Sequence, residues 1–97
     1  MKYEIVFAPE AVSDVRNLKA HWRSAVREAI EACLRHAPTH VSKSRIKRLR
    51  GLSRPQFRLR VGDVRVFYDV RESCVEILAV VPKSEAVAWL EHEGVSR

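Results

Sequence analysis

The chain has 97 residues, of which 46% are hydrophobic and 31% are charged, and its formal net charge is +6. This length and composition predict one folded domain over residues 1–97 and exclude an intrinsically disordered chain. No apolar run approaches the roughly 20 residues that a membrane-spanning helix needs, and the acidic N-terminal stretch is not a signal peptide. We therefore expect a cytoplasmic protein without a membrane partner.

The first half of the chain predicts a strand followed by two helices. Residues 2–7 alternate between polar and apolar side chains, which is typical of a strand. Pro9 suits the first turn of a helix, where its missing N–H costs nothing. Two short helices with one apolar stripe each follow, with the break between them at His21–Trp22, and Pro38 ends the second.

A β-hairpin is predicted around Gly62-Asp63, a pair that suits a two-residue turn with glycine first. This turn sets the register of the two strands. One side of the hairpin is then apolar and is expected to face the core; it carries Phe57, Leu59, Val61, Val64, Val66 and Tyr68.

A third apolar run, residues 74–81, predicts a central strand that Pro82 ends. Ser84 is a candidate N-cap for a last helix over 85–93, which Gly94 closes. Helices followed by strands are typical of an α+β domain. We expect an N-terminal strand, a helical hairpin, a three-stranded antiparallel meander and a short C-terminal helix, with the helices packed on one face of the sheet.

Basic residues are concentrated in residues 43–65, which hold nine of the eighteen Lys and Arg residues and a single acid, Asp63. A local concentration of this kind indicates a surface that attracts a polyanion. Before the hairpin, the connector adds the cations Lys43, Arg45, Lys47, Arg48 and Arg50. These five would extend an RNA-binding surface. They are equally compatible with a solvated loop or with a site for an acidic partner.

The polar side of the predicted hairpin places Arg60 opposite Arg65, with Arg58 nearby. Like charges directly opposite on a sheet repel, so these side chains either extend into water or share an anionic ligand. Arginine binds phosphate oxygens through two parallel hydrogen bonds, and RNA phosphate is the ligand that we expect. Phe67 on the same side either stacks on a nucleobase or packs against the C-terminal segment.

The two cysteines, Cys33 and Cys74, lie far apart in the sequence, and we interpret them as reduced and structural. No Cys/His spacing suggests a metal site. We expect neither a metal nor another cofactor.

A family resemblance is carried by four stretches of the sequence: YEIVFAPEAVSDVRNL, RIKRLRG, QFRLRVGDVRVFYDV and VEILAVVPKSEA. They resemble the RelE/ParE superfamily of toxins from bacterial toxin–antitoxin pairs, over nearly the whole chain and most specifically in the hairpin. The resemblance implies the α+β fold described above and a cognate antitoxin that wraps the toxin and neutralises it. It also implies one of two targets, because the RelE-like branch cleaves mRNA on the ribosome and the ParE-like branch poisons DNA gyrase.

The RelE-like branch implies roles for individual residues. Arg58 and Arg60 would hold and polarise the substrate, and Arg65, three residues before Tyr68, would contact the reacting phosphate. Lys83 stands where a basic residue is often found. The basic connector corresponds to the region of the family that contacts rRNA and mRNA. These roles describe a metal-independent endoribonuclease in which a 2′-hydroxyl attacks the adjacent phosphate.

The C-terminal region departs from the RelE-like pattern. Ser84 stands about where a further arginine is expected, and Trp89 or Leu90 about where a tyrosine acid/base is expected. Tryptophan cannot transfer a proton. His92 is a titratable residue nearby, but its alignment with the family's acid/base residues is poor.

Three functions follow from this mixture of matches and departures. We favour a ribosome-dependent mRNA endonuclease, in which Lys47 or Lys83 would act as base if neighbouring cations lowered its pKa. The second is a gyrase inhibitor without nuclease chemistry, which the missing acid/base residues favour. The third is a degenerate toxin that only binds its antitoxin.

Overall fold

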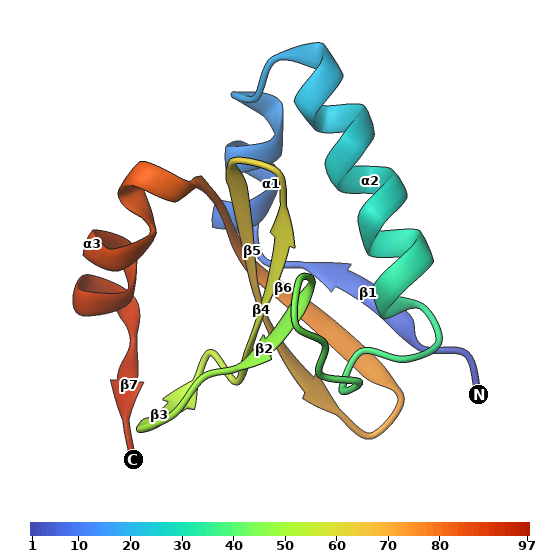
Figure 1. The fold of residues 1–97 in the computed structure, drawn as a ribbon, viewed down its shortest axis with the longest axis vertical. Coiled ribbons are helices and arrows are strands. Elements are labelled where there is room, and N and C mark those ends of the chain that lie inside the picture. Colours follow the sequence, from blue (N-terminus) through green and yellow to red (C-terminus); the bar gives the residue numbers. More distant parts are fainter.

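The computed structural model, which describes all 97 residues, is built on a five-stranded sheet with the order β1-β6-β5-β4-β2 (Figure 1). Two further short strands, β3 and β7, pair with each other at the C-terminal end of the chain. The strands are β1 (Glu4–Phe7), β2 (Ile46–Arg48), β3 (Leu52–Arg54), β4 (Phe57–Val61), β5 (Val64–Arg71), β6 (Cys74–Pro82) and β7 (Val95–Ser96). The helices are α1 (Pro9–Arg16), α2 (Ala20–Leu34) and α3 (Lys83–Glu93).

The predicted antiparallel meander is present as β4, β5 and β6. At one edge, β1 runs parallel to β6, with Ile5 opposite Val75. At the other edge, three residues of the basic connector form β2, which pairs antiparallel with β4 and places Ile46 opposite Leu59. The connector, for which we predicted no strand, therefore extends the sheet by one strand.

The hairpin has the predicted register. Val61 pairs with Val64 across the two-residue turn, Arg60 lies opposite Arg65, and Arg58 lies opposite Phe67. Within the turn only Gly62 has a positive φ, of 56°, as a turn with glycine in the first position requires. All six apolar side chains of the hairpin lie in the main core.

The helices begin and end close to the predicted positions, with two differences. Pro9 opens α1 as expected, but the break falls at residues 17–19 and not at His21–Trp22. The backbone N–H of Asn17 closes the last turn of α1, so Trp22 lies inside α2. No helix has the length and hydropathy of a membrane-spanning segment.

The start of α3 also differs from the prediction. The N-cap residue is Pro82 and no side chain caps the helix, so Ser84 does not have the predicted role. The first helical N–H, that of Lys83, instead donates to the carbonyl oxygen of Asp63 at 2.7 Å. Gly94 ends the helix as predicted, in an extended conformation.

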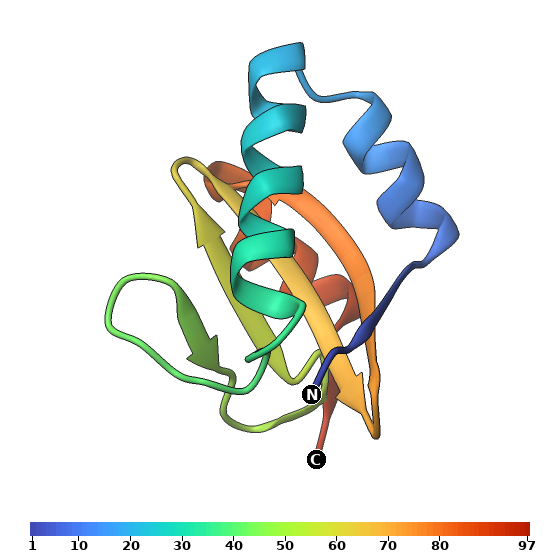
Figure 2. The same ribbon diagram turned by 90° about the vertical axis from the view of Figure 1, so that its right-hand side faces the viewer.

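The three helices lie on both faces of the sheet. α1 and α2 cover the face that carries the main core, as expected, and α3 lies on the opposite side (Figures 1 and 2). There it contacts a smaller cluster, formed by Phe67, Ala79 and Val81 together with Trp89 and Leu90. The face that carries the hairpin arginines, which we expected to be open to solvent or a ligand, is therefore partly covered by α3.

The burial of the Tyr68 side chain in the core can be tested through the pH at which its hydroxyl ionises. Its hydroxyl is buried and donates to the carbonyl oxygen of Pro38 at 2.7 Å. Burial raises the pKa of this phenol, so the folded protein keeps it protonated when the unfolded chain ionises near pH 10. Stability from this group is fully present below pH 10 and is lost as the pH rises above it.

We expect the free energy of unfolding to fall more steeply between about pH 10 and pH 12 in the wild-type protein than in Tyr68→Phe. At neutral pH the variant should lose about 1–3 kcal/mol, because the buried Pro38 carbonyl loses its donor. Urea unfolding followed by circular dichroism at a series of pH values measures both effects. Equal slopes in the two proteins would contradict the assignment.

Candidate nucleic-acid interface

Five cations lie side by side where β2, β4 and β5 meet. The strand register aligns Arg60 with Arg65 and Arg58 with Lys47. Arg45 continues the first of these rows, because the N–H of Arg60 donates to its carbonyl oxygen at 2.8 Å. We call this set the cationic surface; it consists of Arg45, Lys47, Arg58, Arg60 and Arg65.

None of these five cations has an ion-pair partner within the chain. The ion pairs of the protein are elsewhere: Arg35 with Glu31, Arg54 with Asp69 and Glu76, and Arg71 with Glu76. No ion pair therefore relieves the repulsion that the sequence predicted, and the charge of Asp63 opposes it at Arg65 without forming such a pair. The cationic surface is a region of uncompensated positive charge, as a polyanion-binding site requires.

Two arginines of the surface are partly desolvated. Burial lowers the pKa of Arg58, and the charges of Arg65 and Arg60 lower it further. The Nε atom of Arg58 is buried and has no hydrogen-bond acceptor. Burial and the charge of Arg60 likewise lower the pKa of Arg65, against the opposing effect of Asp63. A bound anion would stabilise both guanidinium groups.

Arg65 is the most rigidly held of the five. Its side chain folds back over the hairpin turn, where Nη1 donates to the carbonyl oxygens of Gly62 at 2.7 Å and Val64 at 3.2 Å. Only 7% of the residue is exposed. Its Nε and Nη2 have no protein partner, so one edge of a fixed guanidinium remains for an oxygen ligand.

The other residues predicted for the site lie in different places. Lys83 is exposed at the start of α3, beside Asp63 of the turn. Arg48 points to the core side of the sheet, where its guanidinium lies 5.1 Å from the centre of the Phe57 ring. Arg50 follows β2 at the end away from the hairpin turn, and Lys43 lies in the bend before β2. The structure brings Arg45 and Lys47 to the hairpin arginines and leaves Arg48 and Arg50 apart.

Phe67 is not available for stacking on a nucleobase. It is fully buried, and its ring stacks on that of Trp89 at 4.9 Å with an angle of 5° between the planes. Of the two alternatives for this residue, packing against the C-terminal segment is the one observed. On the β6 side its neighbours Ala79 and Val81 are apolar, and α3 covers them.

The cationic surface contains no imidazole, carboxyl or phenol side chain. Tyr68 points into the core, and burial raises its pKa. His21 packs beside Trp22 on α2, and His36 lies near the carbonyl oxygen of Met1. No cluster of His, Cys, Asp and Glu side chains has the arrangement of a metal site. The amines of Lys47 and Lys83 are the remaining candidates.

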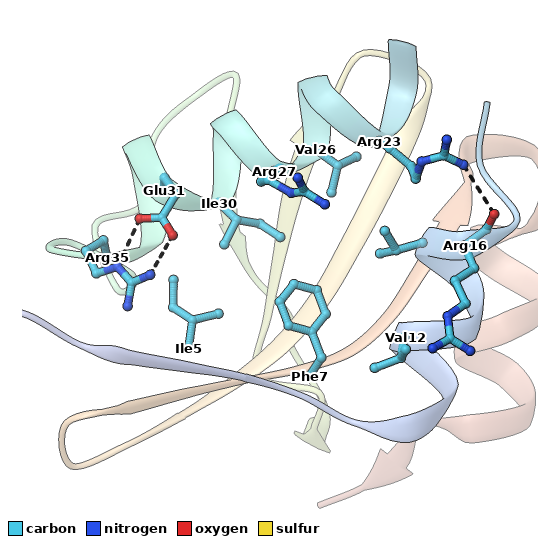
Figure 3. A pocket seen from close by; sticks show the side chains of 11 residues that line it. Ile5, Phe7, Val12, Arg16, Arg23, Val26, Arg27, Ile30, Glu31 and Arg35 are labelled. Atoms are coloured by element: carbon cyan, nitrogen blue, oxygen red, sulfur yellow. Dashed lines mark hydrogen bonds and ion pairs between the residues drawn. The ribbon is translucent and has the colours of Figure 1, made fainter. Parts of the chain in front are cut away.

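A second feature, which the sequence did not reveal, is an apolar groove of about 380 Å³ between β1, α1 and α2 (Figure 3). Its floor includes Ile5, Phe7, Val12, Val26 and Ile30, of which Phe7 and Val12 are more than one-third exposed. Four arginines surround this floor: Arg16, Arg23, Arg27 and Arg35.

The arginines of the groove have different partners. Arg23 donates to the carbonyl oxygens of Leu18 and Arg16, and Arg35 pairs with Glu31. Arg16 and Arg27 have no ion-pair partner. The groove therefore combines apolar surface with free positive charge at its rim, which is complementary to an amphipathic segment with acidic flanks.

The fold and the unpaired cations of the hairpin define a small α+β protein with a candidate site for a polyanion. A family model described as "ParE toxin of type II toxin-antitoxin system, parDE" matches residues 5–87. The chain belongs to this family, and the predicted membership of the RelE/ParE superfamily is confirmed. It is the toxin component of a toxin–antitoxin pair. No curated protein sequence matches the chain.

Solved structures share the fold. A chain of the toxin–antitoxin complex RelBE2 from Mycobacterium tuberculosis is 27% identical, with a TM-score of 0.70 over 84% of this chain and 99% of that chain. The RelB–RelE antitoxin–toxin complex from Methanococcus jannaschii gives 23% identity and a TM-score of 0.68, covering 87% and 96%. An arginine-substituted toxin RelE from E. coli, in the free state, is 20% identical, with a TM-score of 0.70 over 94% of each chain.

The desolvated position of Arg58 leads to a prediction about stability. Arg58→Met keeps the length of the side chain and removes both the buried unpaired Nε and the repulsion from Arg60 and Arg65. We expect the free energy of unfolding to rise by roughly 1 kcal/mol, while RNA binding weakens and its salt dependence becomes shallower by about one counterion.

Urea unfolding and RNA titrations at several salt concentrations measure these two effects. Arg71→Met is the matched control, because Arg71 lies on β5 outside the cationic surface and pairs with Glu76. The control should leave RNA binding unchanged and alter stability little. A less stable Arg58→Met protein would show that repulsion does not govern this site.

Proposed function

We propose that this toxin inhibits translation by binding mRNA on the ribosome through the cationic surface and cleaving it. The observation that supports the proposal is the set of five neighbouring cations without an ion-pair partner, two of them partly desolvated. Phosphate oxygens supply the negative charge that such a surface lacks. Arginine provides paired donors in the geometry that phosphate accepts.

The cleavage would use the substrate's own 2′-hydroxyl as nucleophile. That oxygen loses its proton and attacks the adjacent phosphorus, which forms a pentacoordinate phosphorane. The bond to the 5′-oxygen then breaks, and the products are a 2′,3′-cyclic phosphate and a 5′-hydroxyl that receives a proton. Arg65, held by the turn, would stabilise the phosphorane together with Arg58 and Arg60.

Proton transfer in this proposal relies on lysine and on the ribosome. Lys47 aligns with Arg58 in the strand register, and Lys83 lies beside the hairpin turn. A codon held in the decoding site is already positioned, so that part of the barrier is lowered by orientation alone. The toxin then has to supply mainly electrostatic stabilisation of the transition state.

Inhibition of DNA gyrase without nuclease chemistry is the second candidate. Two observations favour it: the family model that matches the chain is that of ParE toxins, and the cationic surface has no imidazole or phenol. A gyrase inhibitor needs a binding surface and no proton transfer. Expression of such a toxin would produce a DNA-damage response and leave mRNA intact.

The partner proposed for the apolar groove is the cognate antitoxin. The similar structures from M. tuberculosis and M. jannaschii are toxin–antitoxin complexes. In this chain, the groove of Figure 3 offers an apolar floor and the unpaired Arg16 and Arg27. An antitoxin segment with an apolar stripe and acidic flanks is complementary to both.

We expect Arg65→Ala to abolish ribosome-dependent cuts in mRNA, with a rate at least about 100-fold lower than that of the wild-type toxin. Primer extension on mRNA from an in vitro translation reaction, with and without purified ribosomes, measures the cuts. Arg71→Ala on the same strand is the control and should cut normally. Antitoxin binding by both variants verifies that they are folded.

Intact mRNA in the presence of wild-type toxin and ribosomes would exclude the endonuclease proposal. Gyrase-dependent DNA breaks in the same preparation would then establish the second candidate. Undiminished cuts by Arg65→Ala would show instead that the phosphate contact lies elsewhere.

The antitoxin groove is tested with two charge substitutions on the same strand. Phe7→Glu places an acid in the apolar floor, and we expect the affinity for the antitoxin to fall at least about tenfold. Val6→Glu is the control, because Val6 is exposed on β1 but does not line the groove. Calorimetric titration with the antitoxin measures both, and equal losses would place the contact outside the groove.

A further inference from the structure

A cleft of about 620 Å³ is lined by residues of α2, of the tip of the β4–β5 hairpin and of the cationic surface. Figure 2 shows how α2 runs past the tip of this hairpin. The volume of the cleft is within the range of small-ligand sites in proteins. On the α2 side it is lined by Trp22, Glu28 and the small residues Ala29 and Ala32. Helix α2 therefore leaves space where larger side chains would fill it.

Trp22 is held in a defined position at one end of this cleft. Its ring lies so close to the hairpin turn that a Cβ atom at Gly62 would be 2.8 Å from two ring carbons. Only glycine leaves room for the indole here, and its φ of 56° also suits only glycine. The ring is partly exposed and lines the cleft, so it is an ordered aromatic surface.

Two cations of the cationic surface belong to the same lining. Arg45 and Arg60 line the cleft, and neither has an ion-pair partner. The guanidinium of Arg45 donates to the carbonyl oxygen of Arg60 at 3.4 Å, which keeps the two residues together. An aromatic ring and two arginines without ion-pair partners in the same cleft match a nucleotide, which has both a π-face and a phosphate.

Arg60 connects the cleft to the proposed catalytic surface. It lies opposite Arg65 in the hairpin and also lines the cleft with Trp22. An RNA strand that places one phosphate at Arg65 can therefore continue past Arg60 without leaving positive charge. Glu28, which is exposed on α2 and has no ion-pair partner, offers a carboxylate to the amino group of a base or to a ribose hydroxyl.

We infer that this cleft binds one nucleotide of the RNA next to the position of cleavage, with its base stacked on Trp22 and its phosphate held by Arg45 and Arg60. The inference rests on the proposed function, because it takes RNA as the ligand of the cationic surface. Because Phe67 is buried and cannot stack on a base, the inference assigns base stacking to Trp22.

Fluorescence of Trp22 tests the inference directly. The chain has two tryptophans, so Trp89→Phe leaves Trp22 as the only emitter. The probe is a single-stranded hexanucleotide with 2′-O-methyl groups, which binds but cannot be cleaved because it has no 2′-hydroxyl nucleophile. We expect the emission of Trp22 to be quenched as the oligonucleotide binds.

Affinity measurements on the full chain complete the test. Trp22→Leu should weaken oligonucleotide binding by about tenfold, and Trp22→Phe, which keeps an aromatic ring beside Gly62, should weaken it much less. Arg45→Ala should make the salt dependence shallower by about one counterion. Antitoxin binding by each variant verifies the fold.

The possible outcomes separate this inference from the proposed function. Binding that depends on Arg65 but leaves the emission of Trp22 unchanged would overturn the inference and keep the proposed function. Loss of antitoxin binding in Trp22→Leu without loss of RNA binding would also overturn it, and would assign the cleft to the antitoxin. No binding of the oligonucleotide at all, together with intact mRNA, would overturn both.

Discussion

The short turn between β4 and β5 fixes a register on which the other features of the protein depend. Side chains alternate along a strand, so one register places six apolar residues in the core and also places Arg60 opposite Arg65. A slip by one residue would expose the apolar set and bury the arginines. Burial of each large apolar side chain is worth about 1.5–3 kcal/mol, against roughly 0.2–1 kcal/mol for a cross-strand pair. The core therefore imposes the repulsion among the cations, and the proposed function makes use of it.

The features that follow from local pattern were predictable from the sequence. Gly62-Asp63 and the alternation around it define the hairpin and its partners, and Pro9 marks the start of α1. The positions of Arg58, Arg60 and Arg65 follow from that register alone. Local pattern also shows where charge accumulates, although it does not show which connector cations join the hairpin. That depends on the short pairing of β2 with β4, which separates Lys47 from Arg48.

Features that depend on long-range packing were not predictable in the same way. The side of the sheet on which α3 lies follows from Phe67 and Ala79, which pair across β5 and β6 and pack against Leu49 and against side chains of α3. The groove and the cleft are formed between elements, so their lining is visible only once α2 lies against the sheet. Trp22 illustrates the point: helical periodicity assigns it to a core stripe, and it does pack against the core, but its contact with Gly62 and its place in the cleft are visible only in the structure.

The pairing of β3 with β7 joins the C-terminal end of the chain to the segment that follows β2. Arg97 donates to the carbonyl oxygen of Gly51, and Ser53 donates to that of Val95, so the C-terminal residues are joined to the connector that begins with β2. Leu49 of the same connector packs in the cluster beneath α3. The segment around β3 and the C-terminal residues therefore support each other. The backbone amides that join β3 to β7 should exchange with solvent together.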